Sequence, residues 1–238
     1  VEDTHGNLWV GTVLGGLNRY DRLTGLFTHF VHDPQNPDSL GGDCIRALYV
    51  DQQGMLWIGS NGGVDVYDPQ QGTFLAHYRH DPQDPTSLPP NGVNDIHQDQ
   101  TGVMWFATWK GISYQDGDDG SFIYLTHNPN DPASPIDNHV KMIAEDREGN
   151  LWLGTEIGLD RLDRQTLRCE HFKSNPEILG SLSSSYINTI LEDRNGDLWI
   201  GTADGLNLFH RESGYFTVYR NNPADLDSLT DSIILSLY

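Results

Sequence analysis

Trp109 and Lys110 are neighbours in the chain, and together they could hold a polar ligand. An aromatic ring offers a face on which a sugar can stack, and an ammonium group beside it can pair with an anion. Trp109 also stands outside a regular series that contains the other five of the six tryptophans. Residues that recur in such a series mostly serve the repeated structure, and a residue outside the series is a better candidate for function. We therefore predict that Trp109 and Lys110 bind a ligand. The alternative is that Trp109 covers a shallow gap at the rim of the fold.

Further polar residues occupy equivalent places in successive copies of the series. These places hold Arg46, Asn94, Lys141 and Asn188, with Ser236 in the last copy. Two cations among so few basic residues indicate an acidic ligand such as a uronate, with simple charge balance as the alternative. The predicted ligand-binding set joins the first four of these residues to four loop residues. It consists of Arg46, Asn94, Trp109, Lys110, Lys141, Glu156, Asn188 and Asp204.

No pattern in the sequence predicts catalysis, a metal site or a cofactor. There is no nucleophile elbow, P-loop, HExxH motif or zinc-ligand spacing. A glycosidase built from five repeated units around a central channel would need two or three carboxylates at one mouth of that channel. The candidates are Asp43, Asp95, Glu156 and Asp204. They are scattered among apolar and amide positions, so we predict that the protein is not an enzyme.

Five copies of Asp-x-x-Gly-x-(Leu/Met)-Trp organise the chain. They end at Trp9, Trp57, Trp105, Trp152 and Trp199, at spacings of 48, 48, 47 and 47 residues. Each copy contains four short segments of alternating polarity, which we name A to D, with the tryptophan in segment B. Turn residues separate the segments, as expected of four antiparallel strands. We predict an all-β chain.

A four-stranded unit repeated at this interval is typical of a β-propeller blade. We therefore predict one domain over residues 1–238, with five four-stranded blades of about 47–48 residues and the tryptophans wedged between blades. Segment A is missing before Trp9, and Ile233–Tyr238 matches it, so we predict that the C-terminal strand completes the first blade. The join is out of step by one residue, which a bulge could absorb.

Two recurrent features have plain structural interpretations. The Asp-x-x-Gly turns are faintly similar to calcium loops, but five of them without a distal bidentate Glu favour ordinary hairpin turns. His29, His77 and His171 occupy one place in segment D of three blades. They are too far apart to share a metal, and we expect solvated side chains at blade edges.

Charge and composition narrow the range of partners. There are 34 acidic and 14 basic residues, and the net charge of −20 repels phosphate backbones and anionic lipids. We therefore expect neither nucleic acid nor a membrane surface as a direct partner. The two cysteines, Cys44 and Cys169, lie at non-equivalent places and are predicted to be buried thiols. We also expect no membrane span, and any targeting signal would lie outside this segment.

The repeat resembles the two-component regulator propeller repeat over nearly the whole chain. The resemblance rests on Asp-x-x-Gly-Asn-Leu-Trp-Val-Gly-Thr, Gly-Gly-Leu-Asn-Arg-Tyr-Asp, Thr-Gly-x-Phe and His-Asp-Pro-x-x-Pro-x-Ser-Leu. It implies the extracytoplasmic or periplasmic sensor region of a hybrid histidine kinase or diguanylate cyclase, with carbohydrate fragments as ligands. Receptors of this family usually have seven blades per ring, and five repeats depart from that number.

Two functions of different kinds follow as expectations. The first is a sensor module that binds a small polar ligand, such as an oligosaccharide, at the channel mouth. The alternative is a fragment or engineered array with a structural role, which self-associates through open blade edges and has no ligand. A five-bladed glycosidase is a lesser alternative.

Overall fold

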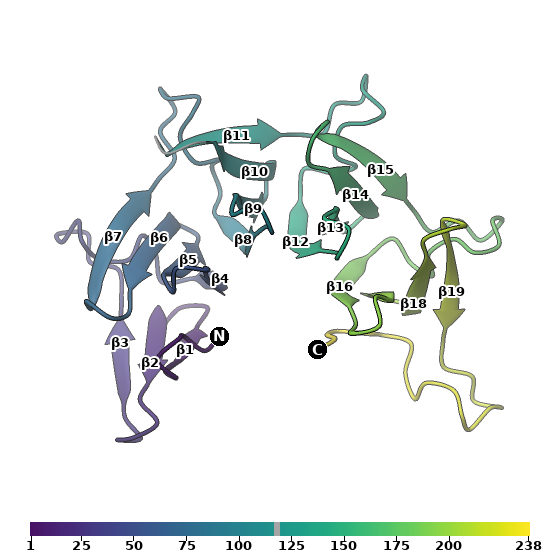
Figure 1. The fold of residues 1–238 in the computed structure, drawn as a ribbon, viewed down its shortest axis with the longest axis horizontal. Helices are drawn as coiled ribbons and strands as arrows, with labels where there is room; N and C mark the ends of the chain where they lie inside the picture. Colours follow the sequence, from purple (N-terminus) through teal and green to yellow (C-terminus); the bar gives the residue numbers. More distant parts are fainter. Residues whose placement is uncertain (117–119) are drawn as a thin grey trace. The chain divides into compact units, whose positions relative to one another are not determined.

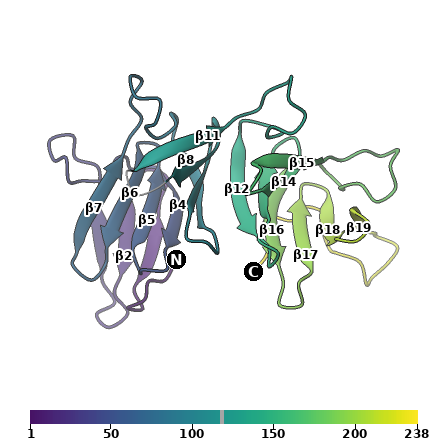
Figure 2. The same cartoon turned by 45° about the horizontal axis from the view of Figure 1, so that its top comes forward.

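The computed structural model describes residues 1–116 and 120–238, and these residues form strands, turns and loops without a helix. It follows that the described ranges contain no helix long and apolar enough to cross a membrane. The chain divides into two compact units, residues 1–124 (unit 1) and residues 125–238 (unit 2). Each unit is a set of antiparallel sheets whose strands are hydrogen-bonded in chain order (Figures 1 and 2).

Unit 1 contains three sheets. The first consists of β1 (Leu8–Gly11), β2 (Leu17–Tyr20) and β3 (Phe27–Phe30). The second consists of β4 (Ile45–Val50), β5 (Leu56–Ser60), β6 (Gly63–Asp68) and β7 (Thr73–Tyr78). The third consists of β8 (Val93–Gln98), β9 (Met104–Thr108), β10 (Gly111–Asp116) and β11 (Ser121–Leu125).

Unit 2 contains two sheets of four strands. The fourth sheet consists of β12 (Val140–Glu145), β13 (Leu151–Thr155), β14 (Leu159–Asp163) and β15 (Arg168–Phe172). The fifth consists of β16 (Ile187–Glu192), β17 (Leu198–Thr202), β18 (Gly205–His210) and β19 (Tyr215–Tyr219). We call the five sheets blades 1 to 5 in chain order. The predicted segments A to D correspond to the four strands of blades 2 to 5, and segments B to D correspond to the three strands of blade 1.

Blade 1 differs from the predicted four strands. Its sheet has three strands, and Glu2 adds one isolated bridge to Leu8 at the place that Val50 has opposite Leu56 in blade 2. Ile233–Tyr238, predicted to be a strand, has no regular secondary structure in the described fold. A strand requires a hydrogen-bonded neighbour along its length, and in unit 2 this segment has only isolated backbone bonds, such as Ile234 N–H to Thr202 O at 3.0 Å.

The Asp-x-x-Gly turn links each tryptophan to its blade. In blade 2, Asp51 Oδ1 accepts the backbone N–H groups of Gln53 and Met55, and Asp51 Oδ2 accepts the Trp57 indole N–H at 2.7 Å. The same indole bond is present in all five copies, at 2.7–3.2 Å. The turn glycine has φ between 82° and 94°, which glycine adopts without strain. The predicted hairpin turn is confirmed.

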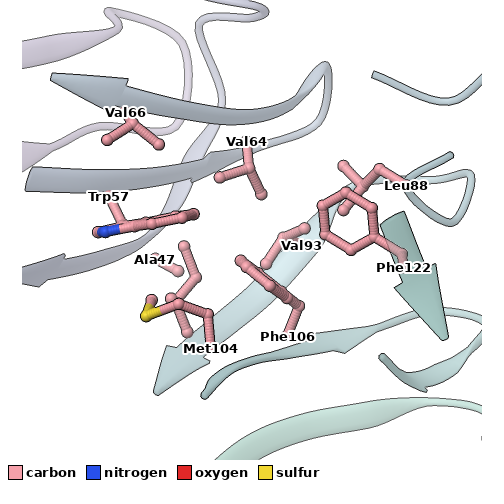
Figure 3. Packing of buried hydrophobic residues seen from close by; sticks show 10 residues of the cluster. Ala47, Trp57, Val64, Val66, Leu88, Val93, Met104, Phe106 and Phe122 are labelled. Carbon is pink, nitrogen blue, oxygen red and sulfur yellow. The ribbon is translucent and has the colours of Figure 1, made fainter. Parts of the chain in front are cut away.

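Tryptophan rings pack between neighbouring blades of the same unit. In unit 1, Trp57 of blade 2 lies 5.9 Å from Phe106 of blade 3, within a buried cluster that also includes Leu88, Val93 and Phe122 (Figure 3). In unit 2, Trp152 of blade 4 contacts Phe209 of blade 5 edge-on at 5.1 Å. The predicted wedge between blades is therefore confirmed within each unit, and it holds the blade ends that carry the candidate site.

Candidate functional site

The four polar residues predicted to be equivalent occupy one structural position. Arg46, Asn94, Lys141 and Asn188 each lie at a β-bulge, where the register of strand A against strand B shifts between the residues on either side. A bulge breaks the alternation of side chains and turns one of them out of the sheet. The position is thus built to direct a polar side chain away from its own blade.

The B–C turns lie beside the chain that leads into strand A. In unit 1, Asn61 of the β5–β6 turn exchanges hydrogen bonds with Cys44, with Asn61 N–H donating to Cys44 O and Cys44 N–H to Asn61 Oδ1. In unit 2, Ala203 of the β17–β18 turn donates to Tyr186 O at 3.1 Å. These turns and bulges therefore share one end of the blades within each unit.

In unit 1 this end carries a ring and a cation in contact. The Arg46 guanidinium carbon lies 5.6 Å from the centroid of the Trp109 ring, and the Trp109 side chain is 40% exposed. Lys110 follows in the same turn and is also exposed, its backbone N–H donating to Thr108 Oγ1. We call Arg46, Trp109 and Lys110 the Trp109 platform. The structure thus brings together three of the four residues predicted in unit 1, from β4 and from the β9–β10 turn.

In unit 2 the same end carries a different group, the Tyr186 cluster of His139, Lys141, Glu156 and Tyr186. Lys141 Nζ lies 3.9 Å from the centroid of the Tyr186 ring and donates to Ile187 O at 3.0 Å. The Tyr186 hydroxyl lies 3.4 Å from Glu156 Oε1, which is 3.7 Å from His139 Nδ1. Lys141 and Glu156 were predicted, and Tyr186 is the side chain that connects them.

The other predicted residues of unit 2 have structural partners. Asn188 Nδ2 donates to Ile234 O at 3.0 Å, as Lys141 donates to Ile187 O, so both bulge residues hold the next copy of segment A. Asp204 Oδ2 accepts Arg220 Nε–H at 3.1 Å. Asp43 Oδ1 accepts the His32 backbone N–H at 2.7 Å. Asp95 Oδ1 accepts the Ile96 backbone N–H at 2.9 Å, so three of the four carboxylates considered for a glycosidase are engaged in local structure.

Sequence reasoning missed His139 and Tyr186. Both directly precede strand A, where the other copies have Cys44, Gly92 and Ile233. This variation between copies is the same signal that singled out Trp109, and it would have pointed to the Tyr186 cluster.

The interpretation of the segment D histidines as solvated edge residues was wrong for two of them. His77 Nδ1 lies 2.7 Å from the fully buried Asp65, and His171 Nδ1 lies 2.6 Å from the fully buried Asp160. His29 stays exposed and bonds Asn18 Oδ1 at 2.6 Å. Strands C and D pair in the same register in all three blades, so each histidine lies opposite a polar residue. The difference lies in that residue, because Asp65 and Asp160 are fully buried carboxylates that also accept a backbone N–H of the loop entering the blade, whereas Asn18 is a half-buried amide.

Burial raises the pKa of two groups in blade 4. Burial raises the pKa of the Asp160 carboxyl, and the hydrogen bonds from Ile136 N–H and His171 oppose that rise only in part. Burial likewise raises the pKa of the Cys169 thiol, with a smaller contribution from the Asp160 charge. Cys44 and Cys169 are both free thiols, Cys44 half-buried and Cys169 buried. In the described part of the chain, no group of three or more His, Cys, Asp or Glu side chains could hold a metal ion.

Comparison with known proteins identifies the repeat. The family model of the two-component regulator propeller matches residues 39–62, 87–110, 134–156 and 181–204. The chain therefore carries two-component regulator propeller repeats, and its fold class is an all-β propeller of five blades. No curated protein matches the sequence.

Solved structures agree with this class. The extracellular domain of a putative hybrid two-component system from B. thetaiotaomicron is 28% identical, with a TM-score of 0.77 over 93% of this chain. This chain covers 30% of that protein. PorZ, a surface component of the type-IX secretion system of Porphyromonas gingivalis, is 18% identical with a TM-score of 0.71 over 98% of this chain and 34% of PorZ. Virginiamycin B lyase from Staphylococcus aureus is 18% identical with a TM-score of 0.65 over 94% of this chain and 69% of the lyase. At 18% identity the last two show the fold alone.

Proposed function

We propose that this propeller is the ligand-binding sensor region of an extracytoplasmic signalling receptor, and that it is not an enzyme. The repeats and the likeness to the extracellular domain of a hybrid two-component system support this proposal. The ligand would be a small polar molecule, and binding would act on an output region by shifting a population of conformations. The net charge of −20 supports the further proposal that neither nucleic acid nor a membrane surface is a direct partner.

The observation that carries the proposal is the Trp109 platform. Tryptophan and arginine are the residue types most enriched at the centres of binding sites, and here the exposed Trp109 ring has Arg46 against it. Arg46 places a cation against that ring, and Lys110 follows Trp109 in the same turn, in a protein of strong negative charge. A local site of this kind suits an acidic oligosaccharide, whose ring stacks on the indole while its carboxylate pairs with the guanidinium.

Replacing Trp109 by Ala is expected to weaken binding of an oligogalacturonate by at least about tenfold, because a central aromatic contact is worth about 2 kcal/mol or more. Arg46→Gln should weaken the acidic oligosaccharide and leave a neutral one of the same length unchanged. The measurement is a calorimetric titration, after a thermal-shift screen of acidic and neutral oligosaccharides. Leu23→Ala is the matched control, since Leu23 is 97% exposed in the β2–β3 turn.

Two results would count against this site. One is an acidic oligosaccharide that binds the Trp109→Ala variant as tightly as the parent protein. The other is turnover of a chromogenic glycoside that is lost in Glu156→Gln, which would favour the glycosidase alternative.

Closure of blade 1 by the C-terminal segment remains a proposal. Ile234 N–H donates to Thr202 O as Ile45 N–H donates to Thr12 O, so residues from Ile234 onward begin like a segment A. We expect a concentration-independent monomer by light scattering on a sizing column. A dimer or larger species would instead favour self-association through open blade edges, the structural alternative.

A further inference from the structure

Blade 5 contains a cavity that is separate from the Trp109 platform. It has a volume of about 680 Å³ and lies within unit 2, between the loop of residues 174–183 and β19. This volume is within the range of small-molecule sites. Its wall includes one of the predicted site residues, Asp204.

The cavity coincides with a departure from the repeat. In blade 4, His171 of strand D bonds Asp160 through Nδ1 and reaches the loop carbonyl Pro132 O through Nε2 at 2.9 Å. In blade 5 the residues at those places are Val218, paired opposite Asn207, and Leu179 in the loop. A valine has no donor to hold the loop carbonyl, so blade 5 lacks the side chain that ties strand and loop together in blade 4.

The cavity is lined by apolar residues, polar residues and one cation. Leu182 and Phe216 are buried within it, and Leu179 is 97% exposed at its rim. Arg220 lies in the same lining with a side chain that is 47% exposed.

Arg220, which lines the cavity, keeps unused hydrogen-bonding capacity. Its Nε–H donates to Asp204 O and Oδ2, and its Nη2 donates to Ser183 O at 3.2 Å. Among the described residues, Nη1 has no hydrogen-bond partner. The equivalent arginine of blade 2, Arg79, instead pairs with the buried Asp65, a charge that blade 5 replaces by the neutral Asn207.

We propose that this cavity binds a small organic carboxylate with an apolar or aromatic body. The body would lie against Leu179, Val218 and Phe216, and the carboxylate would accept hydrogen bonds from the Arg220 guanidinium, whose planar donors match a carboxylate. Asp204 keeps that guanidinium in place by its bond to Nε, so its role is positioning.

The test uses the full chain with 4-phenylbutyrate as the probe and the uncharged 4-phenylbutanol as its partner, in titrations followed by ligand-observed NMR. The acid should bind saturably and at least fivefold more tightly than the alcohol. Arg220→Gln should remove that preference and leave the affinity for the alcohol unchanged. Val218→His, which introduces the blade 4 residue, should restore the hydrogen bond between strand and loop, narrow the cavity and weaken both probes at least fivefold.

A matched pair of leucines provides the control. Leu179→Asp should weaken both probes at least fivefold, whereas Leu226→Asp should change neither. Leu226 has the same place in the next loop and is 99% exposed, but it does not line the cavity. Because both leucines are on the surface, these two variants test the site even where Val218→His fails to fold. Absence of saturable binding, equal affinity for acid and alcohol, or equal effects of the two leucine variants would overturn the proposal.

Discussion

Replacing Trp152 by Ala is expected to lower the free energy of unfolding by about 3–5 kcal/mol, the usual loss for a large aromatic residue removed from a core. Trp152 is fully buried, and its ring contacts Phe172 of its own blade at 5.7 Å and Phe209 of the next blade at 5.1 Å. Its removal would leave a cavity in the aromatic contact between the two blades of unit 2, where Phe172 also meets Phe209, and would leave Asp146 without the indole N–H.

Trp199 is the control for this prediction because it holds the same place in blade 5. It is half-buried, its ring contacts Tyr219 at 5.9 Å, and its indole bond is longer, at 3.2 Å. Trp199→Ala should therefore lower the free energy of unfolding clearly less than Trp152→Ala does. The measurement is urea unfolding followed by far-UV circular dichroism. Equal losses for the two variants would show that the wedge between blades contributes little beyond the local turn.

Strands A and B were predictable because the same residues make the same contacts in each copy of the repeat. The Asp and Trp of every turn make the same hydrogen bond, so their spacing alone locates strands A and B. The equivalence of Arg46 and Lys141 followed from the same alignment, and both lie at bulges.

Contacts that depend on strand register were not predictable in this way. His77 and His171 face buried carboxylates only because strands C and D pair in a register that places them opposite Asp65 and Asp160. Composition of segment D contains no such information. Tyr186 was missed for a different reason, since it belongs to the chain leading into strand A, which contributed no residue to the predicted ligand-binding set.

The blade 5 cavity shows how one substitution within a repeat can have a consequence beyond its own position. Val218 in place of a histidine removes a hydrogen bond between strand and loop, and Asn207 in place of an aspartate frees the nearby arginine from an inward ion pair. Both changes occur in the same blade, and only the structure shows that Val218 and the affected arginine, Arg220, line one cavity.

The second large effect is expected at Asp146. This carboxylate is fully buried and accepts hydrogen bonds from the Trp152 indole at 2.8 Å, the Asn150 backbone at 2.9 Å and Arg211 Nη1 at 2.7 Å. Asn in its place would put an amide N–H₂ against these donors and leave Arg211 without its buried partner. We expect Asp146→Asn to lower the free energy of unfolding by about 3–5 kcal/mol at neutral pH, the usual loss when a buried ion pair is broken.

The same site predicts a pH dependence of stability. Burial alone would raise the pKa of Asp146, but the hydrogen bonds from Arg211, Trp152 and Asn150 outweigh burial and lower that pKa below its ordinary value of 3.8. A carboxyl whose pKa is lowered in the folded state stabilises the fold above the unfolded value and loses this stabilisation as the pH falls through the folded value. The parent protein should therefore lose stability below about pH 4, and Asp146→Asn should lose less over the same range.

Asp160 is the control, since it is equally buried in the same blade but has a pKa that burial raises. Blades 1 and 5 already have Asn18 and Asn207 at its place, and Asn207 Oδ1 accepts Ser183 N–H at 2.8 Å as Asp160 Oδ2 accepts Ile136 N–H at 2.7 Å. Asp160→Asn should therefore change the free energy of unfolding by about 1 kcal/mol or less at neutral pH. It should also leave the acid-side loss intact, because a raised pKa favours the folded state as the pH falls. Urea unfolding from pH 3 to pH 7 compares the three proteins, and equal behaviour of the two variants would mean that burial, and not the donors around Asp146, decides the contribution of these carboxylates.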